Sequence, residues 1–395
     1  MKIGIYGGTF DPIHRGHITA AQAAAQQLGL DLLLLIPASI PPHKALPEGG
    51  ADAAQRLEMA TLATAELSCP AQVLDVEVRR QGKSYTADTL RTLRQQYPED
   101  ELWLLMGTDM FLSLQDWREP QEILRLARVA AFSRTGDPEQ QRFARQKAYL
   151  EETFGAQVTV VENPHVVDIS STRLRQLLPE GREYLPEAVY GYILRQRLYG
   201  THAELKHLTP EELRPIALSF LKPKRMPHVL GTEQEAIRLA RRYGADETDA
   251  RIAALLHDCT KKLDMEQQLA LCRRYDIRLD ELEQHALKLL HAKTGAAVAR
   301  DIFGVKDAVY KAIRWHTTGK PDMTLLEKVI YLADYIEPNR DFPGVDELRR
   351  AVYDDLDKGL LMGLSDTIDE MERMGNPVHH DTLEARDFLL RGEAK

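Results

Sequence analysis

The first half of the chain alternates short apolar runs with amphipathic stretches. Between the runs lie segments with helical periodicity, at residues 20–28, 51–67, 86–97 and 120–127. The apolar runs predict buried strands at residues 2–6, 32–37, 73–78, 102–106, 129–133 and 158–161. Strands that alternate with helices imply right-handed crossovers, a parallel sheet, and a ligand site at the carboxyl ends of the strands.

The pattern changes from about Thr209, where helical periods follow one another almost without strands. Thr209 itself supplies a helix cap, followed by a proline and acidic residues in the first turn. We expect helices at residues 233–243, 246–256, 265–275, 279–290, 294–303, 307–315, 325–336 and 345–374. The sequence therefore predicts an α/β Rossmann-like domain over residues 1–203 and an all-α domain over 204–395, joined near residues 200–207.

The composition of the chain is that of a globular protein and argues against some kinds of binding partner. Of the 395 residues, 44% are hydrophobic and 28% are charged, and the formal net charge is −9, which argues against bulk binding to nucleic acid or to a membrane surface. The apolar run at residues 32–36 is too short to span a bilayer. Three widely spaced cysteines and the absence of a recognisable signal peptide predict a cytoplasmic protein. The oligomeric state stays open, a homo-oligomer included.

The most informative segment is residues 4–17, a short strand that runs into a glycine-rich turn and ends in His-Arg-Gly-His. Gly7 and Gly8 allow the backbone to approach a phosphate closely. His14 and His17 lie about one turn apart at the opening of a helix, where two imidazoles and the helix N-terminus can stabilise charge on the α-phosphate of a nucleotide. This string resembles the signature of the nucleotidyltransferase superfamily.

Further segments after the predicted strands suit the same chemistry. Lys44 offers a point charge to a phosphate, and Asp109 suits a ribose or a metal ion. Trp117 can stack on a flat ring, and Arg134 follows the fifth strand. Two helix openings, at residues 85–89 and 169–175, offer hydroxyl and free N–H groups to anions. Taken singly, each of these residues is equally compatible with surface packing or helix capping.

Together and in this order, the segments over roughly residues 1–200 resemble the bacterial nicotinate mononucleotide adenylyltransferases. The resemblance implies adenylyl transfer from ATP, with Mg²⁺, to nicotinate mononucleotide, giving deamido-NAD and pyrophosphate. Backbone N–H groups around Thr86 and Trp117 would select the pyridine carboxylate. Pantetheine-phosphate and choline- or glycerol-phosphate enzymes of the superfamily fit the later segments less well. The resemblance assigns Lys44, Thr86, Trp117 and Arg134 to the mononucleotide, and to ATP Gly7, Gly8, Thr9, Phe10, His14, His17, Asp109, Ser170, Ser171 and Arg175.

The helical half carries a second set of chemistry-bearing residues. His257 and Asp258 lie side by side in an apolar stretch, where a charged carboxylate is costly unless it is paired or bound to a metal. Imidazoles combined with carboxylates suit Fe, Mn, Ni, Co or Zn better than Mg alone. The order His…His-Asp…Asp is the signature of the HD phosphohydrolase superfamily.

Residues 209–375 resemble, more specifically, the bacterial HD proteins that cleave diadenosine tetraphosphate symmetrically into two ADP. The resemblance implies a two-iron centre bound by His228, His257, Asp258, His291, His316 and Asp334. Asp258 is the expected bridge, with His228, His257 and Asp334 on one metal and His291 and His316 on the other. His285 competes with His291 but lacks its sequence context. Candidates to neutralise a polyphosphate are Lys261, Lys293 and Arg340.

Two alternatives stay open for the helical half. It could be a broader nucleotide phosphohydrolase, (p)ppGpp-related enzymes included, or a metal-bound module that senses nucleotides and regulates the transferase. The presence of every ligand type favours catalysis over sensing.

Overall fold

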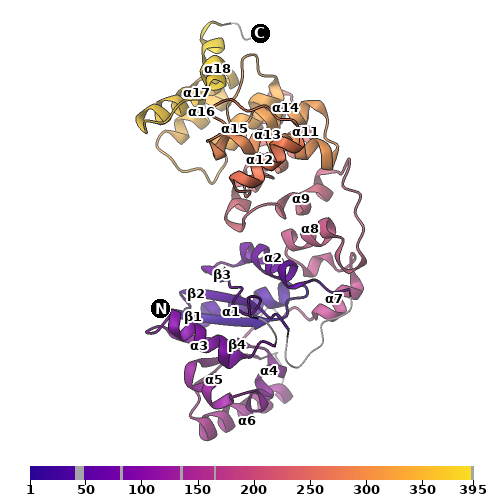
Figure 1. Cartoon of the computed structure of the whole chain (residues 1–395), viewed down its shortest axis with the longest axis vertical. Helices are drawn as coiled ribbons and strands as arrows, with labels where there is room; N and C mark the ends of the chain where they lie inside the picture. The colour runs from indigo at the N-terminus through magenta and orange to yellow at the C-terminus, as the bar shows by residue number, and fades with distance from the viewer. Residues whose placement is uncertain (41–48, 81–82, 134–136, 164–165, 393–395) are drawn as a thin grey trace. The chain divides into compact units, whose positions relative to one another are not determined.

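The structure, a computed structural model, describes residues 1–40, 49–80, 83–133, 137–163 and 166–392. Its chain divides into two compact units, Met1–His202 and Ala203–Lys395 (Figure 1). None of the described helices is long and apolar enough to cross a lipid bilayer.

The first unit is built on a six-stranded parallel sheet of order β3-β2-β1-β4-β5-β6. This confirms the predicted α/β class. The strand order reverses between β1 and β4, and ligands of open α/β sheets bind at such a point, beyond the carboxyl ends of the strands. The strands are β1 (Lys2–Gly8), β2 (Leu32–Pro37), β3 (Ala71–Val73), β4 (Glu101–Met106), β5 (Arg128–Ser133) and β6 (Val158–Glu162).

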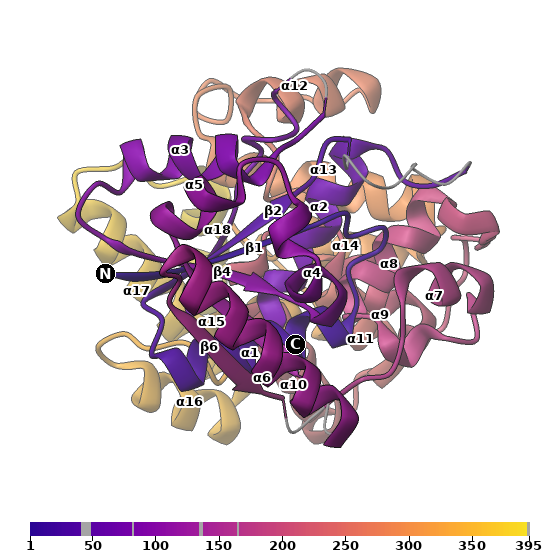
Figure 2. The same cartoon turned by 90° about the horizontal axis from the view of Figure 1, so that it is seen from below.

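Helices pack against the sheet through their apolar faces. Figure 2 shows the helices of this unit beside its strands. α1 contacts β1, β5 and β6, and α2 contacts β2 and β3. Residues of α3, α4, α5 and α6 share a buried cluster with Ile3 and Ile5 of β1. The helices of this unit are α1 (Arg15–Leu28), α2 (Ala53–Ala63), α3 (Thr86–Gln96), α4 (Thr108–Leu112), α5 (Pro120–Leu126), α6 (Asp137–Phe154), α7 (Ser171–Leu177) and α8 (Glu187–Gln196).

The second unit is helical throughout its described part, as predicted. α10 packs against α11 and α15, and α14 packs against α11, α13 and α15, so these five helices form one core. The helices are α9 (Pro210–Leu218), α10 (Met226–Tyr243), α11 (Glu247–Leu256), α12 (Met265–Arg274), α13 (Leu287–Phe303), α14 (Asp307–Trp315), α15 (Leu325–Ile336), α16 (Val345–Asp354), α17 (Leu356–Arg373) and α18 (His380–Leu390).

Several predicted elements were wrong in extent, and three of them are instructive. The strand expected at 73–78 ends at Val73, because Leu74 and Val76 pack on the core from a turn. The helix expected at 279–290 begins only at Leu287. The long helix expected at 345–374 is two helices, because Asp355 is extended (φ −148°, ψ 122°) and its side chain accepts the N–H of Lys358, which caps α17.

Candidate active sites

The turn after β1 is shaped by close packing. A Cβ at Gly8 would lie 2.8 Å from the ring of Phe10, and Phe10 itself is buried with φ 50°. At Gly7, by contrast, a Cβ would meet no described atom within 4 Å. Gly8 is therefore required by the fold, whereas Gly7 leaves the backbone accessible to a ligand, in keeping with the expected phosphate approach.

His14 and His17 lie together at the start of α1. Their ring centroids are 3.8 Å apart, and the backbone N–H of His14 donates to His17 Nδ1 at 3.2 Å. In the neutral His17 ring the proton therefore sits on Nε2, which can donate to a ligand. A Cβ at Gly16 would approach His14 Nδ1 to 3.0 Å and the carbonyl of Val167 to 3.1 Å, so this glycine admits the His14 ring.

Burial controls the charge of the two imidazoles. It lowers the pKa of His14 to about 4, and burial together with the neighbouring His14 holds the pKa of His17 well below its ordinary value. Both rings are neutral near pH 7 in the absence of an anion. A phosphate placed against them favours the protonated form, so the pair gains its charge where a charged ligand arrives.

The buried side chain of Arg56 in α2 links two backbone segments beside this site, and sequence reasoning gave it no role. Its Nη1 donates to the carbonyls of Thr9 at 2.9 Å and Ala38 at 2.5 Å, and its Nη2 donates to Ser39 O at 3.0 Å. The side chain is fully buried. Arg56 thus ties the turn after β1 to the segment after β2, and only the tertiary structure reveals it.

The first residues of α7 contact the turn after β1, although the two segments lie far apart in the sequence. Ser171 Oγ donates to Pro12 O at 2.9 Å, and Arg175 Nη1 donates to Asp11 O at 2.5 Å. Ser170 Oγ accepts from the N–H of Arg173 at 3.2 Å and so caps the helix. The expected ATP residues of this segment are therefore brought to the glycine-rich turn.

Asp109 and Thr86 both lie in the first turn of a helix. Asp109, in α4 directly after β4, is exposed at the point where the strand order reverses. Trp117 is half-buried against the core of the unit. Its backbone N–H donates to Leu114 O at 3.2 Å. The expected donor at Trp117 is therefore already used. Two expected mononucleotide residues, Lys44 and Arg134, lie outside the described residues.

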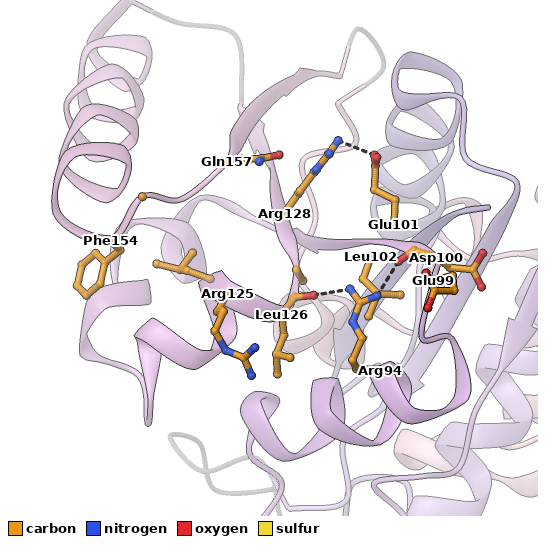
Figure 3. A pocket seen from close by; sticks show the side chains of 13 residues that line it. Arg94, Glu99, Asp100, Glu101, Leu102, Arg125, Leu126, Arg128, Phe154 and Gln157 are labelled. Atoms are coloured by element: carbon orange, nitrogen blue, oxygen red, sulfur yellow. Dashed lines mark hydrogen bonds and ion pairs between the residues drawn. The ribbon is translucent and has the colours of Figure 1, made fainter.

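A cavity of about 500 Å³ lies at the opposite edge of the sheet, where β4 and β5 begin (Figure 3). Its charged groups are largely paired within the protein. Arg94 donates to the carbonyls of Asp100 and Leu126, and Arg128 pairs with Glu101 at 2.8 Å. We assign this cavity no catalytic role, because it lies away from the carboxyl ends of the strands.

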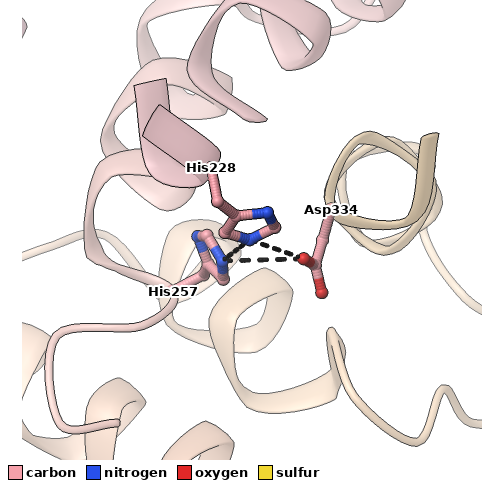
Figure 4. Close-up of side chains that lie close together, drawn as sticks. All are labelled: His228, His257 and Asp334. Atoms are coloured by element: carbon pink, nitrogen blue, oxygen red, sulfur yellow. Dashed lines mark hydrogen bonds and ion pairs between the residues drawn. The ribbon is translucent and has the colours of Figure 1, made fainter. Parts of the chain in front are cut away.

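In the second unit, the expected imidazoles and carboxylates form one buried cluster. His228 of α10 and His257 at the end of α11 are 3.3 Å apart between their Nε2 atoms, and Asp334 Oδ1 of α15 lies 2.9 Å from His228 Nε2 (Figure 4). His291 of α13 and His316 at the end of α14 form a second pair, 3.1 Å apart between Nε2 atoms. His285 is exposed and belongs to neither pair.

Asp258 lies between the two pairs. Its Oδ2 is 3.4 Å from His257 Nε2 and 3.9 Å from His228 Nε2, whereas its Oδ1 is 3.2 Å from His291 Nε2 and 3.9 Å from His316 Nε2. The residue is completely buried. Burial alone would raise the pKa of Asp258, but His257, His291 and Lys261 hold it well below its ordinary value. An ionised carboxylate thus faces two sets of imidazoles.

Hydrogen bonds orient all four rings in the same way. Three Nδ1 atoms lie 2.6–2.7 Å from a backbone carbonyl three residues earlier: Ala254, Lys288 and Ile313 for His257, His291 and His316 respectively. His228 Nδ1 lies 3.1 Å from Glu337 Oε1. A ring that donates from Nδ1 presents the lone pair of Nε2, which is the arrangement of metal-bound histidines. The donor set and the tautomers therefore fit two divalent metal ions.

Glu337 reaches His228 because a glycine lies beneath it. A Cβ at Gly231 would lie 2.1 Å from Glu337 Oε2. That oxygen accepts from the backbone and side-chain nitrogens of Asn339 at 2.7 and 2.9 Å. Sequence reasoning gave no role to Gly231, Glu337 or Asn339, although all three lie in segments on which the resemblance to the HD proteins rests.

Cations border the cluster. Arg225 pairs with Asp258, Lys261 Nζ is 3.1 Å from Asp258 Oδ1, and Arg340 Nη2 is 2.8 Å from Asp334 Oδ1. Lys293 is not brought to the cluster. Its buried ammonium pairs with Glu283 and donates to Arg278 O at 3.3 Å, so it is committed to the fold.

A cavity of about 350 Å³ opens over the cluster. His291, His316 and Asp334 lie in its wall, with the ammonium-bearing side chains of Lys261 and Lys288. The remaining lining residues are polar or aromatic, namely Thr317, Tyr331, Tyr335 and Thr367. Imidazole and carboxylate groups able to bind a metal, cations and aromatic rings therefore surround one space of a size that suits a nucleotide.

Comparisons with known proteins agree with this division. Residues 5–177 match the family described as cytidylyltransferase-like, and residues 225–339 match the HD domain family. A Gloeobacter violaceus protein named "Probable nicotinate-nucleotide adenylyltransferase" is 43% identical over 209 residues, which are 51% of this chain and 98% of that protein. A Halalkalibacterium halodurans protein named "Bis(5'-nucleosyl)-tetraphosphatase, symmetrical" is 41% identical over 179 residues, 44% of this chain and 95% of that protein. The chain belongs to both families.

The HD domain also matches a solved structure. A Clostridium acetobutylicum protein described as a predicted HD superfamily hydrolase involved in NAD metabolism is 42% identical, and the match covers 47% of this chain and 98% of that one, with a TM-score of 0.46. By the residues that the two family models match, the imidazole pair at the turn after β1 belongs to the cytidylyltransferase-like domain, and the histidine–aspartate cluster belongs to the HD domain.

Proposed function

We propose that this protein is a bifunctional enzyme. Its cytidylyltransferase-like domain transfers the adenylyl group of ATP to nicotinate mononucleotide, giving deamido-NAD and pyrophosphate. Its HD domain hydrolyses diadenosine tetraphosphate symmetrically to two ADP. The observation that carries the first activity is the neutral His14–His17 pair beside the strand-order reversal, and Asp258 between two imidazole pairs carries the second.

Adenylyl transfer needs no side-chain nucleophile. The phosphate of the mononucleotide attacks the α-phosphorus of ATP in line, and pyrophosphate leaves, so the protein acts by positioning and by stabilising charge. His14 and His17 lie together at the N-terminus of α1, where His17 can donate from Nε2. We assign Asp109 to the ribose or to the Mg²⁺ that accompanies ATP. Ser171 and Arg175 hold the turn against α7.

Selection of nicotinate over nicotinamide is assigned to the first turn of α3. Its cap residue, Tyr85, makes no side-chain capping bond. In the described part of the chain, no carbonyl or side chain accepts the N–H of Thr86 or of Ala87. Free N–H groups at a helix start favour a carboxylate over an amide. A desolvated donor pair is worth roughly 2–3 kcal/mol, on the order of a hundredfold in kcat/KM.

Thr86→Pro tests this assignment by removing one N–H group. Proline is tolerated at the first helical position, and Tyr85 already has the extended backbone (φ −110°, ψ 134°) that a following proline requires. We expect the kcat/KM preference for the acid over the amide to fall about tenfold, whereas Thr86→Ala, which keeps the N–H, should preserve the preference. An unchanged preference in Thr86→Pro would contradict the role of the helix start.

The HD chemistry follows from the ligand arrangement. His228, His257 and Asp334 would hold one metal ion, His291 and His316 a second, and Asp258 would give one carboxylate oxygen to each. When bound, such ions polarise a phosphate and lower the pKa of water for attack. Lys261, Lys288 and Arg340 lie where they can neutralise a polyphosphate, and Tyr335 offers a ring beside it.

Turnover by the full chain tests both assignments. We expect ATP and nicotinate mononucleotide with Mg²⁺ to yield deamido-NAD and pyrophosphate, and metal-loaded protein to convert diadenosine tetraphosphate to ADP alone, both followed by chromatography. Formation of AMP and ATP from the tetraphosphate would contradict symmetrical cleavage. Tight binding of the tetraphosphate without turnover would favour a sensing role for the HD domain.

A further inference from the structure

A second histidine–carboxylate group lies in the HD domain, formed by the turn before α13 and the start of α18. His379, His380 and Asp280 bring their ligand atoms within 4.8 Å of one another. Asp280 Oδ2 is 3.2 Å from His379 Nε2 and 3.5 Å from His380 Nδ1. The other oxygen of Asp280 accepts the N–H of Glu283 at 2.8 Å, which fixes the direction of the carboxylate.

One buried atom of this group faces two carboxylates without a well-aligned hydrogen bond. His379 is 5% exposed, yet its Nε2 is buried and takes part in no hydrogen bond of acceptable geometry among the described residues. It points toward Asp280 and toward Glu283, whose Oε1 is 3.5 Å away. Two carboxylates that converge on one imidazole nitrogen favour a positive charge there, which either a proton on Nε2 or a metal ion supplies, since an unpaired buried polar atom is costly.

Asp381 orients both rings toward the same point. Its Oδ1 is 3.3 Å from His380 Nε2, and its Oδ2 is 3.5 Å from His379 Nδ1. When those two nitrogens donate to Asp381, His379 Nε2 and His380 Nδ1 present lone pairs toward Asp280. One carboxylate behind two histidines is the outer arrangement found at metal sites. In the structure, His379 Nδ1 accepts the N–H of Asp381 at 3.2 Å. In the metal-bound form, donation from Nδ1 to the Asp381 carboxylate would replace this bond.

We propose that Asp280, His379 and His380 bind one divalent transition-metal ion, such as Zn²⁺. This site is separate from the HD cluster, the name used here for the buried group around Asp258. Tetrahedral zinc with bonds of about 2.0–2.1 Å separates its ligand atoms by roughly 3.3 Å, close to the 3.2 and 3.5 Å observed. Glu283 is engaged by Lys293, so water completes the coordination. The ion would fasten α18 to the turn before α13.

Zinc binding by the full chain tests the proposal, with Asp258→Asn as the background that weakens the HD cluster. After chelator treatment and dialysis against Zn²⁺, we expect the added substitution His380→Ala to lower bound zinc by one equivalent. His285→Ala, which removes another exposed histidine nearby, should lower it by none. His380 is exposed, so the variant is expected to fold, and circular dichroism checks this.

The readout is the difference between paired variants, so it does not depend on how much metal the HD cluster retains. Co²⁺ in place of Zn²⁺ should give a tetrahedral visible absorption band in the background protein that His380→Ala abolishes. Equal zinc content with and without His380, or no Co²⁺ band that depends on it, would overturn the proposal and leave a proton as the cation at His379.

Discussion

Replacement of Asp258 by asparagine should abolish hydrolysis of diadenosine tetraphosphate and strip the HD domain of both metal ions. Asparagine keeps the shape of the side chain but loses the charge, and a neutral amide cannot give an anionic oxygen to each of two metals. Because each oxygen of Asp258 faces a different imidazole pair, one substitution affects both ions. We expect a loss of at least roughly a thousandfold in kcat, measured by chromatography of ADP, with metal content determined by elemental analysis.

The neighbouring residue gives a matched control. Cys259 is buried beside Asp258, but its Sγ is directed to Gly295 O at 3.7 Å, so Cys259→Ala should retain both metals and activity. His316→Ala should lose mainly one ion, because His316 belongs to a single pair. Retention of two metals and of turnover by Asp258→Asn would refute the bridging role.

Replacement of His17 by alanine should lower kcat for adenylyl transfer by about a hundredfold to a thousandfold, with little change in KM for ATP. The ring presents Nε2–H because Nδ1 accepts from the backbone of His14. A donor placed against charge that develops at the α-phosphate acts mainly in the transition state. Initial rates of pyrophosphate release, measured over a range of ATP concentrations, separate the two parameters.

The second activity of the chain serves as the internal control for this variant. Hydrolysis of diadenosine tetraphosphate by His17→Ala should equal that of the unmodified protein, because the HD ligands lie in the other unit. His202→Ala removes an exposed histidine from the same unit and should leave transfer unchanged. An increase in KM with an unchanged kcat would show that His17 only binds ATP.

Local signals determined much of the fold. The helices expected at 307–315 and 325–336 have those bounds in the structure, and the strand expected at 32–37 is β2. Their apolar periods are strong, and Thr324 caps the second helix through Glu327 N–H. The expectation failed where one apolar period ran through a turn, as at Asp355, since periodicity does not register a break that keeps the same buried face.

By itself, the sequence determined the fold classes, the glycine-rich turn and the residue types of both candidate sites, because these depend on neighbours along the chain. Only the tertiary structure decided that Arg56 joins two loops, that Lys293 is buried on Glu283, and that Asp280 meets His379. These contacts join segments far apart in sequence. Their geometry depends on how whole helices and strands pack, which no local pattern encodes.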